Sequence, residues 1–295
     1  MKRRLAISVP HPGPLPEGEG DEGSLREFHI RENMALLSRW RIHKAVADPA
    51  NVDVSEQNGV RSLHLGSDTV QSSMRLSAPN DLELHYTRSM MAFLLFHPEP
   101  REILMVGLGG GSMAKFVHHY LPGCRTTALD INPQVIAIAR SHFFLPPDDE
   151  RLSVLEEEGA QYVATHPACA DVILADGFDG RTLAEPLSTQ MFFTDCRRAL
   201  THNGVFAINL WGSDKNFPTY LQRINESFDN LTLCLPTERH GNIIVFGFQR
   251  SQGNPTWAEL QVRAKELQER YYLDFPRFVD RLHDLNLHAE KRLLL

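Results

Sequence analysis

Several features that mark common protein classes are missing from this sequence. It has only four cysteines and no Cys-x-x-Cys pair, so neither a disulfide framework nor a zinc site is expected. Lysine and arginine (30) are outnumbered by aspartate and glutamate (37), and the net charge of -7 offers no basic field to a nucleic acid or a membrane surface. No apolar run approaches the roughly 18 residues of a membrane helix. We therefore predict a cytoplasmic protein with no nucleic-acid or membrane partner.

Turn residues and apolar segments divide the chain into four parts. The first is rich in proline, glycine and acids, lacks apolar periodicity, and is expected to be a disordered tail. In the second, Asn58-Gly59 indicates a β-hairpin, and residues 82–96 form a candidate helix. The predicted parts are a tail (1–26), a small N-terminal β unit with its linking helix (27–98), a Rossmann-like nucleoside-binding domain (99–250) and a C-terminal helical extension (251–295), broken at Pro276.

Within the third part, apolar strand-like segments alternate with helical ones. Five such strand–helix units follow one another between residues 102 and 228. This alternation predicts an α/β fold with a mostly parallel sheet covered by helices on both faces. Two further strands, 230–236 and 242–248, are joined by a short turn and predict an antiparallel hairpin at the sheet edge.

A glycine-rich segment, GLGGGS from Gly107 to Ser112, stands between the first parallel strand and its helix, where a doubly wound fold binds a nucleotide. Asp130 ends the next strand about twenty residues later, where a carboxylate accepts hydrogen bonds from ribose hydroxyls. The spacing fits G-x-G-x-G. It does not fit G-x-G-x-x-G, because Ser112 stands at the third glycine, and no G-K-[ST] motif follows. The spacing therefore disfavours NAD and excludes a phosphate-binding P-loop.

A G-x-G-x-G loop with an acid at the end of the second strand resembles the class I S-adenosylmethionine-binding fold. The resemblance implies that the adenosine and the sulfonium arm of the ligand lie across the glycine turn. It also implies that an acid and two small residues after the third strand surround the adenine amino group. For Glu158, the alternative is a solvated acidic helix start. The implied ligand-contacting positions are Gly107, Gly109, Gly111, Asp130, Glu158, Gly159 and Ala160.

Two carboxylates follow the fourth strand of this domain. Asp176 stands at the carboxyl end of an apolar run, where open α/β sheets bind ligands and react, and Asp179 follows in a glycine-flanked turn. A pair of carboxylates at this position could bind a cationic amine, and one of them could take its proton. Both side chains could instead cap backbone N–H groups in an Asx-type turn.

The order of these segments resembles the spermidine/spermine synthase family, the polyamine aminopropyltransferases, over about 51–248. The matching segments are TVQSS, LHYTRSM, VGLGGGSMAKF, TALDINPQVIAIAR, EEEGAQYV and DVILADGFDG. The resemblance implies that Gln71 contacts the nucleoside and that Tyr86 contacts the diamine. It further implies that Asp176 is the base that activates the attacking amine and that Asp179 is a second carboxylate nearby. The implied reaction moves an aminopropyl group from decarboxylated S-adenosylmethionine to an amine, and methylthioadenosine leaves.

Two positions depart from the family pattern. Gly110 stands where the family carries an aspartate that binds the amino end of the decarboxylated donor. Loss of that charge-assisted hydrogen bond, worth about 1.5–3 kcal/mol, favours a donor that keeps its carboxylate, which is S-adenosylmethionine itself. Arg88 stands where the family often has an acid, although it could equally be a solvated helix residue.

We therefore predict a spermidine-synthase-like transferase of polyamine biosynthesis, acting on a small-molecule amine and forming a homodimer by resemblance. The alternatives are a methyltransferase that uses S-adenosylmethionine and a catalytically inactive nucleoside-binding homologue. No metal is expected, because the adjacent His118 and His119 point about 100° apart on a helix. Asn209, Trp211 and Asp214 follow the fifth strand and either shape an acceptor pocket or serve a structural role.

Overall fold

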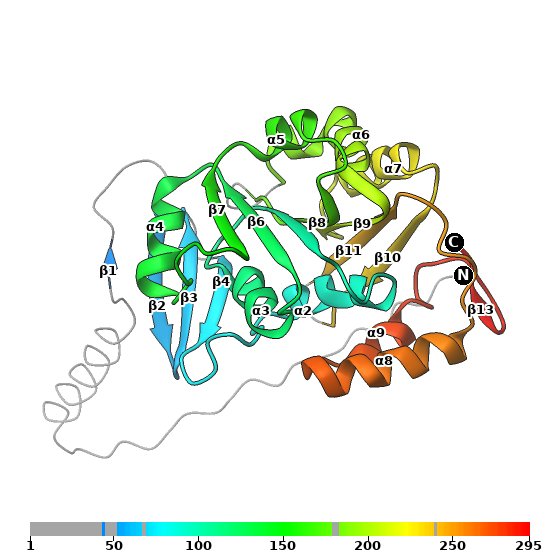
Figure 1. The fold of residues 1–295 in the computed structure, drawn as a ribbon, viewed down its shortest axis with the longest axis horizontal. Coiled ribbons are helices and arrows are strands. Elements are labelled where there is room, and N and C mark those ends of the chain that lie inside the picture. Colours follow the sequence, from blue (N-terminus) through cyan, green and yellow to red (C-terminus); the bar gives the residue numbers. More distant parts are fainter. Residues whose placement is uncertain (1–42, 45–51, 67–68, 179–182, 239–240) are drawn as a thin grey trace, which may run out of the picture. The chain divides into compact units, whose positions relative to one another are not determined.

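A seven-stranded sheet forms the centre of the protein in the computed structural model, which describes residues 43–44, 52–66, 69–178, 183–238 and 241–295. Its strand order is β10-β11-β9-β8-β5-β6-β7 (Figure 1). Strands β5 to β9 run parallel to one another, whereas β11 pairs antiparallel with both β9 and β10. The strands are β5 (Glu102–Val106), β6 (Arg125–Asp130), β7 (Leu152–Glu156), β8 (Ala170–Ala175), β9 (Leu200–Trp211), β10 (Thr232–Pro236) and β11 (Asn242–Phe248).

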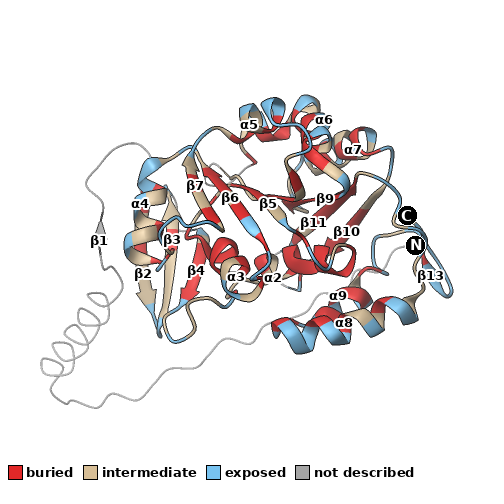
Figure 2. Ribbon diagram, in the orientation of Figure 1, coloured by how far each residue is buried: buried red, intermediate tan, exposed pale blue. Residues whose placement is uncertain are grey.

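Helices cover both faces of this sheet, as the alternating pattern predicted (Figure 1). On one face, α5 (Gly159–Thr165), α6 (Gln190–Ala199) and α7 (Phe217–Ser227) pack against the strands in one apolar cluster. The other face carries α3 (Ser112–Tyr120), α8 (Trp257–Tyr271) and α9 (Phe275–Arg281), with their buried sides toward the strands (Figure 2). The fold class predicted from the sequence, a mostly parallel Rossmann-like sheet with an antiparallel edge hairpin, is confirmed.

A second, antiparallel sheet precedes the central one. It contains β1 (His43–Lys44), β2 (Val52–Gln57), β3 (Val60–Leu65) and β4 (Val70–Arg75) in that order. Asn58 and Gly59 both have positive φ, which is the two-residue hairpin geometry that the Asn-Gly pair predicted. The apolar side of this sheet packs on α4 (Pro133–His142) through Val135 and the adjoining Phe143, so the small sheet lies beside the glycine loop.

The helix predicted over residues 82–96 is shorter and changes type. Only α2 (His85–Met90) is an α-helix, and it continues as the 3-10 helix η1 (Met91–Leu95). Every residue of η1 is buried and apolar. Tertiary packing therefore determines its conformation more than helical periodicity does. A further 3-10 helix, η2 (Glu185–Ser188), follows β8.

The C-terminal prediction was wrong at Pro276. The chain leaves α8 at Tyr272, which has φ of 57°, and Pro276 lies in the first turn of α9. Proline fits there because the first turn of a helix leaves its N–H groups unbonded in any case. The last residues form a short hairpin of β12 (His288–Ala289) and β13 (Arg292–Leu293), which the helical composition did not predict.

No helix in the described ranges combines the length and apolar character that crossing a bilayer requires. The tail predicted over 1–26 lies outside the described residues, and the domain boundaries at 26, 98 and 250 stay predictions.

Candidate active site

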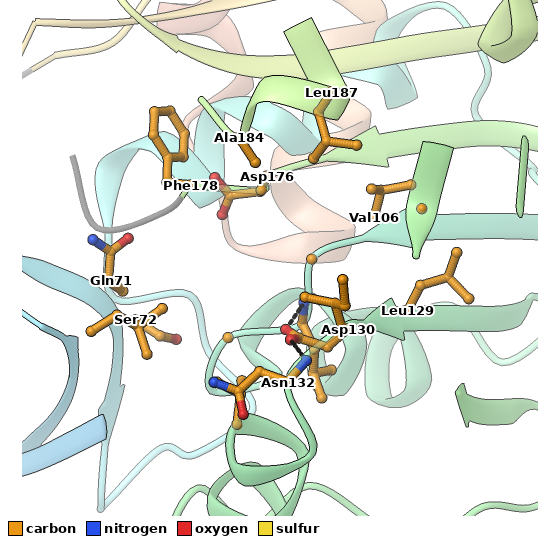
Figure 3. A pocket seen from close by; sticks show the side chains of 18 of the residues that line it. Gln71, Ser72, Val106, Leu129, Asp130, Asn132, Asp176, Phe178, Ala184 and Leu187 are labelled. Carbon is orange, nitrogen blue, oxygen red and sulfur yellow. Dashed lines mark hydrogen bonds between the residues drawn. The ribbon is translucent and has the colours of Figure 1, made fainter. Parts of the chain in front are cut away.

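A cavity of about 500 Å³ opens at the carboxyl ends of β5, β6 and β8 and extends to β4 of the small sheet (Figure 3). Such a volume suits a nucleoside-sized ligand with a second small molecule beside it. The predicted site residues that line it are Gln71, Tyr86, Gly107, Gly109, Asp130, Glu158, Gly159 and Asp176. Gly111 and Ala160 do not line it, and Asp179 lies outside the described residues.

The glycine-rich loop between β5 and α3 packs closely against the residues that follow β8. Gly107 has φ of 96°, and a Cβ atom added there would lie 2.3 Å from the backbone oxygen of Asp176. The Asp176 N–H donates to the Val106 carbonyl at 2.8 Å. Only glycine allows this close approach of two backbones, so Gly107 places Asp176 beside the loop. Gly111 has φ of 71° and forms the N-cap of α3, a structural position behind the cavity wall.

Asp130 stabilises the glycine-rich loop through hydrogen bonds to backbone N–H groups. Its carboxylate accepts hydrogen bonds from the backbone N–H of Leu108 at 3.1 Å and of Asn132 at 2.9 Å (Figure 3). Burial raises the pKa of this carboxyl group, and the backbone hydrogen bonds partly offset the rise. Asp130 therefore fixes the loop conformation while it lines the cavity, which is compatible with additional hydrogen bonds from ligand hydroxyls.

Glu158 caps a helix, in line with the alternative interpretation of this residue as part of an acidic helix start. It is the N-cap of α5, and its two carboxylate oxygens accept from Ala160 N–H at 3.0 Å and Gln161 N–H at 2.8 Å. Gly159 packs so tightly on β5 that a Cβ atom would lie 2.3 Å from a Val106 methyl group. A small residue at 159 thus keeps the cavity floor open, and Glu157 lines the same wall.

Asp176 is half-buried at the end of β8, and its side chain faces the cavity (Figure 3). The Asn209 side-chain amide donates to its Oδ1 atom at 3.0 Å, and the Tyr86 hydroxyl lies within hydrogen-bonding reach of its carboxylate. Burial raises the pKa of Asp176, while these two hydrogen bonds lower it. A carboxylate in this setting can accept a proton, because its charged form is costly without further partners.

Tyr86 connects the two walls of the cavity. Its hydroxyl lies 2.9 Å from the Gln71 carbonyl oxygen, and it is also within hydrogen-bonding reach of Asp176. One hydroxyl has one hydrogen, so Tyr86 donates to one of these acceptors at a time. Burial and the neighbouring Asp176 raise the pKa of Tyr86 well above its usual range, so the phenol stays protonated.

The space beside Gly110 is filled. A Cβ atom at this position would lie 2.8 Å from the Phe143 ring and 2.8 Å from the Ser72 hydroxyl. Phe143 is fully buried, and the Ser72 hydroxyl is hydrogen-bonded to the Ser112 hydroxyl at 3.1 Å. Any side chain at 110 therefore requires the Phe143 ring or the Ser72 hydroxyl to shift.

Arg88 does not line the cavity. Its Nε atom donates to the Leu82 carbonyl, and its side chain contributes to a separate polar hollow with His85, Glu238 and Arg277. The positive charge of Arg88, at a position where the family often has an acid, thus lies outside the cavity. Trp211 and Asp214 do not line the cavity either.

Comparison with known proteins identifies the family. The spermine/spermidine synthase domain model matches residues 83–252. Over 257 residues the chain is 44% identical to a polyamine aminopropyltransferase of Chromobacterium violaceum, and the alignment covers 87% of this chain and 98% of that protein. The chain belongs to the spermine/spermidine synthase family. The resemblance stated from the sequence is confirmed.

Solved structures of other proteins share this fold. A probable spermidine synthase from Corynebacterium glutamicum aligns with a TM-score of 0.64 at 20% identity, over 75% of this chain and 86% of that one. Human methyltransferase-like protein 13 in complex with SAH aligns with a TM-score of 0.55 at 25% identity, over 70% of this chain and 96% of that one. The sheet of the spermine/spermidine synthase family therefore also occurs in a methyltransferase-like protein.

Two residues that line the cavity, Ser72 and Asn132, were not predicted from the sequence. Asn209, for which an acceptor-pocket role or a structural role was predicted, lies behind Asp176 and does not line the cavity. Asn209 carries a detectable signal, because a polar residue at the end of a strand next to that of Asp176 is expected at the same sheet edge. Ser72 has no comparable signal, since its place depends on how the small sheet packs. In the described part of the chain, no cluster of three or more metal-binding side chains is present.

Proposed function

We propose that this protein transfers an aminopropyl group from decarboxylated S-adenosylmethionine to a small primary amine, as a polyamine aminopropyltransferase. One observation carries the proposal: a half-buried carboxylate with a raised pKa, Asp176, faces a cavity whose other wall is the G-x-G-x-G loop with Asp130. The 44% identity to a protein of that name over nearly its full length supports the same conclusion.

The reaction is a single displacement. The amine begins as an ammonium, and Asp176 takes one proton from it, which leaves a nitrogen lone pair. That lone pair forms a bond to the carbon next to the sulfonium sulfur while the carbon–sulfur bond breaks, and its electrons neutralise the sulfonium. Methylthioadenosine leaves. The protein contributes orientation and a desolvated base, and proton transfer of this kind is worth about 10²–10⁴ in rate.

In this proposal the donor lies against the glycine loop and the acceptor lies beside Asp176. Gln71, Asp130 and Glu158 are proposed to contact the nucleoside, together with Gly107, Gly109 and Gly159. Tyr86 is proposed to hold the acceptor amine next to the base. For Gly111 and Ala160 we propose indirect roles, because they do not line the cavity. The second carboxylate, Asp179, remains a proposed acceptor contact.

Methyl transfer from S-adenosylmethionine is the competing function. It is favoured by the crowded position at Gly110, where no carboxylate can bind the amino end of the decarboxylated donor. The likeness to human methyltransferase-like protein 13 points the same way. Hydroxyl groups of Ser72 and Ser112 accept and donate hydrogen bonds, so they suit either donor tail.

Binding and turnover distinguish the two functions. Thermal unfolding is measured with decarboxylated S-adenosylmethionine, S-adenosylmethionine and methylthioadenosine, and turnover is then measured with putrescine as acceptor and each donor in turn. We expect all three ligands to raise the unfolding temperature and spermidine to form only with the decarboxylated donor. Tighter binding of S-adenosylmethionine without any spermidine would overturn the proposal in favour of methyl transfer.

Asp176→Asn provides the matched control for this experiment. The amide keeps the shape of the carboxylate but cannot accept the proton. We expect the variant to bind methylthioadenosine as the wild type does and to lose about 10²–10⁴ of kcat. If no ligand changes the unfolding temperature of either protein, the nucleoside site itself is refuted.

A further inference from the structure

Behind Asp176, two buried asparagines continue the hydrogen-bonded chain into the sheet. Asn242 Nδ2 donates to Asn209 Oδ1 at 2.9 Å, and Asn209 Nδ2 donates to Asp176 Oδ1 at 3.0 Å. Asn209 is 3% exposed and Asn242 is 7% exposed. We propose that Asn209 and Asn242 form an amide relay that orients the Asp176 carboxylate toward the acceptor. The proposal rests on the proposed function, in which Asp176 is the base.

The sheet topology brings the three residues together. Ala175 pairs with Ile208 across β8 and β9, so Asp176 follows directly beside Asn209. Asn242 is the first residue of β11 and pairs with Trp211, two residues beyond Asn209. Residues two apart on a strand share a face, so Asn209 and Asn242 are diagonal neighbours on one side of the sheet. The relay thus crosses three adjacent strands at the edge where the cavity opens.

An amide needs such a partner to have a fixed direction. The asparagine side chain has a donor end and an acceptor end of nearly equal size, and a flip would present its oxygen to the Asp176 carboxylate. Asn242 prevents that flip, because it donates to Asn209 Oδ1 and leaves the NH₂ end for Asp176. Neither asparagine lines the cavity, so both act through Asp176 and are positioning residues.

Few other groups compete for this carboxylate. Among the described residues, the other group within hydrogen-bonding reach of Asp176 is Tyr86 on α2, whose hydroxyl lies on the cavity side and donates to the Gln71 carbonyl at 2.9 Å. Asp130 and Glu158 line the cavity from β6 and the start of α5, and each is engaged with backbone N–H groups. Asn209 therefore supplies the fixed hydrogen bond to Asp176, whereas the Tyr86 hydroxyl is shared with Gln71.

A double-mutant cycle tests the relay. The variants are Asn209→Leu, Asn242→Leu and the pair, and the measured quantities are kcat, the KM for the donor, and the pH dependence of kcat/KM. We expect Asn209→Leu to lower kcat about tenfold and to move the acidic limb up by about one pH unit, with little change in the donor KM. Asn242→Leu should act in the same direction, and the double variant should match Asn209→Leu alone.

Asn225→Leu on α7 is the matched control. It removes an asparagine that accepts from the Thr232 hydroxyl at 2.6 Å, on the helix that covers the opposite face of the sheet. We expect its pH profile to equal that of the wild type. Additive effects of the two relay substitutions would overturn the proposal, and so would an unchanged acidic limb in Asn209→Leu.

A titration of Asp176 separates this inference from the proposed function. Carbon-13 NMR of aspartate-labelled protein, with Asp176→Asn used for assignment, reports the pKa of this carboxyl group without turnover. We expect a higher pKa in both leucine variants, and an unchanged pKa would refute the relay even in an inactive protein. If the leucine variants do not fold, Asn209→Ser and Asn242→Ser break the same hydrogen bonds with smaller polar side chains. Both serine variants should then also raise the pKa of Asp176.

Discussion

At the scale of single residues, the candidate site depends on how a few polar groups are desolvated. Burial raises the pKa of Asp176, and hydrogen bonds from Asn209 and Tyr86 limit the rise. The protonation of Asp176, the proposed base, is therefore sensitive to each hydrogen bond that its carboxylate receives. The positions of Asp176 and Asp130 could be predicted from the sequence because Asp176 directly follows an apolar strand and Asp130 ends one. The Asn242 contact could not, since it requires knowing that β11 lies beside β9.

Tyr86→Phe should move the acidic limb of kcat/KM to higher pH. The substitution removes a hydrogen bond that favours the charged carboxylate, so the pKa of Asp176 rises and the base is protonated over a wider acidic range. A hydrogen bond to a charged group corresponds to about one to two pH units. Tyr120→Phe also removes a hydrogen bond to an aspartate, Asp81, but outside the cavity, and its profile should not move.

Gly107→Ala should destabilise the fold and the site together. A Cβ atom at 107 meets the Asp176 carbonyl oxygen, and φ of 96° is strained for any side chain, so we expect a loss of about 3 kcal/mol or more in unfolding free energy. Gly123→Ala is the control, because its Cβ would meet nothing within 4 Å, and it should stay within about 0.5 kcal/mol. Urea unfolding of both variants measures the difference. Equal stabilities would contradict the tight contact at Gly107.

At the scale of elements, α3 is joined to the small sheet through an internal lysine. Lys115 is 2% exposed, and its Nζ atom donates to the Phe143 carbonyl at 2.6 Å and lies 3.0 Å from the Met74 sulfur. The start and end of α3 could be predicted from the glycine loop and the apolar spacing. The inward direction of its lysine could not, because a lysine on a helix ordinarily faces solvent.

The pH dependence of stability should reveal this lysine. Burial lowers the pKa of Lys115 from 10.5 to about 8, whereas the unfolded chain keeps the ordinary value. Below pH 8 the Lys115 amine is charged in both the folded and the unfolded chain, and the folded protein bears the full free-energy cost of burying that charge. Between pH 8 and 10.5 the folded state releases the proton first, so the free energy of unfolding rises by up to about 3 kcal/mol.

Lys115→Met isolates that contribution, because the other groups that titrate in this range are unchanged. Chemical unfolding of both proteins at several pH values between 7.5 and 10.5 should show the wild type gaining stability relative to the variant. A constant difference across this range would mean that the Lys115 pKa is not lowered.

The elements that the sequence did not predict share a physical cause. The 3-10 helix η1 is apolar on every side, so no periodic pattern marks its geometry. The hairpin of β12 and β13 is too short to give an alternating pattern, and a bridge between Thr256 and Arg292 attaches it to the start of α8. Long amphipathic helices and buried strands carry their own signal, whereas short packed segments depend on their neighbours.

At the scale of the whole molecule, the cavity joins two sheets that are distant in sequence. Gln71 and Ser72 come from the small sheet, and Asp130 and Asp176 come from the central one (Figure 3). Both sheets could be predicted from the sequence, but the way in which they pack together could not. That packing is formed by α4 and by the Ser72–Ser112 hydrogen bond. The predicted homodimer stays a prediction, and analytical ultracentrifugation would test it.

Methylthioadenosine should therefore protect both sheets at once. A ligand that contacts both walls resists opening of either, so hydrogen exchange should slow at β4 and at the loop after β5 together. The edge strand β10 lines no part of the cavity, and its exchange should respond least. Protection confined to the central sheet would show that the small sheet does not contact the ligand.

The Phe143 ring packed against Gly110 also constrains how this protein can evolve. Installing an aspartate at 110 by one substitution places its Cβ atom against a fully buried ring and an engaged hydroxyl. An aspartate at 110 therefore needs compensating changes at Phe143 and Ser72, whereas a smaller side chain at 143 alone leaves a cavity beneath the small sheet. Substitutions at these positions should thus be non-additive, so an aspartate reaches position 110 only through a first step that costs stability.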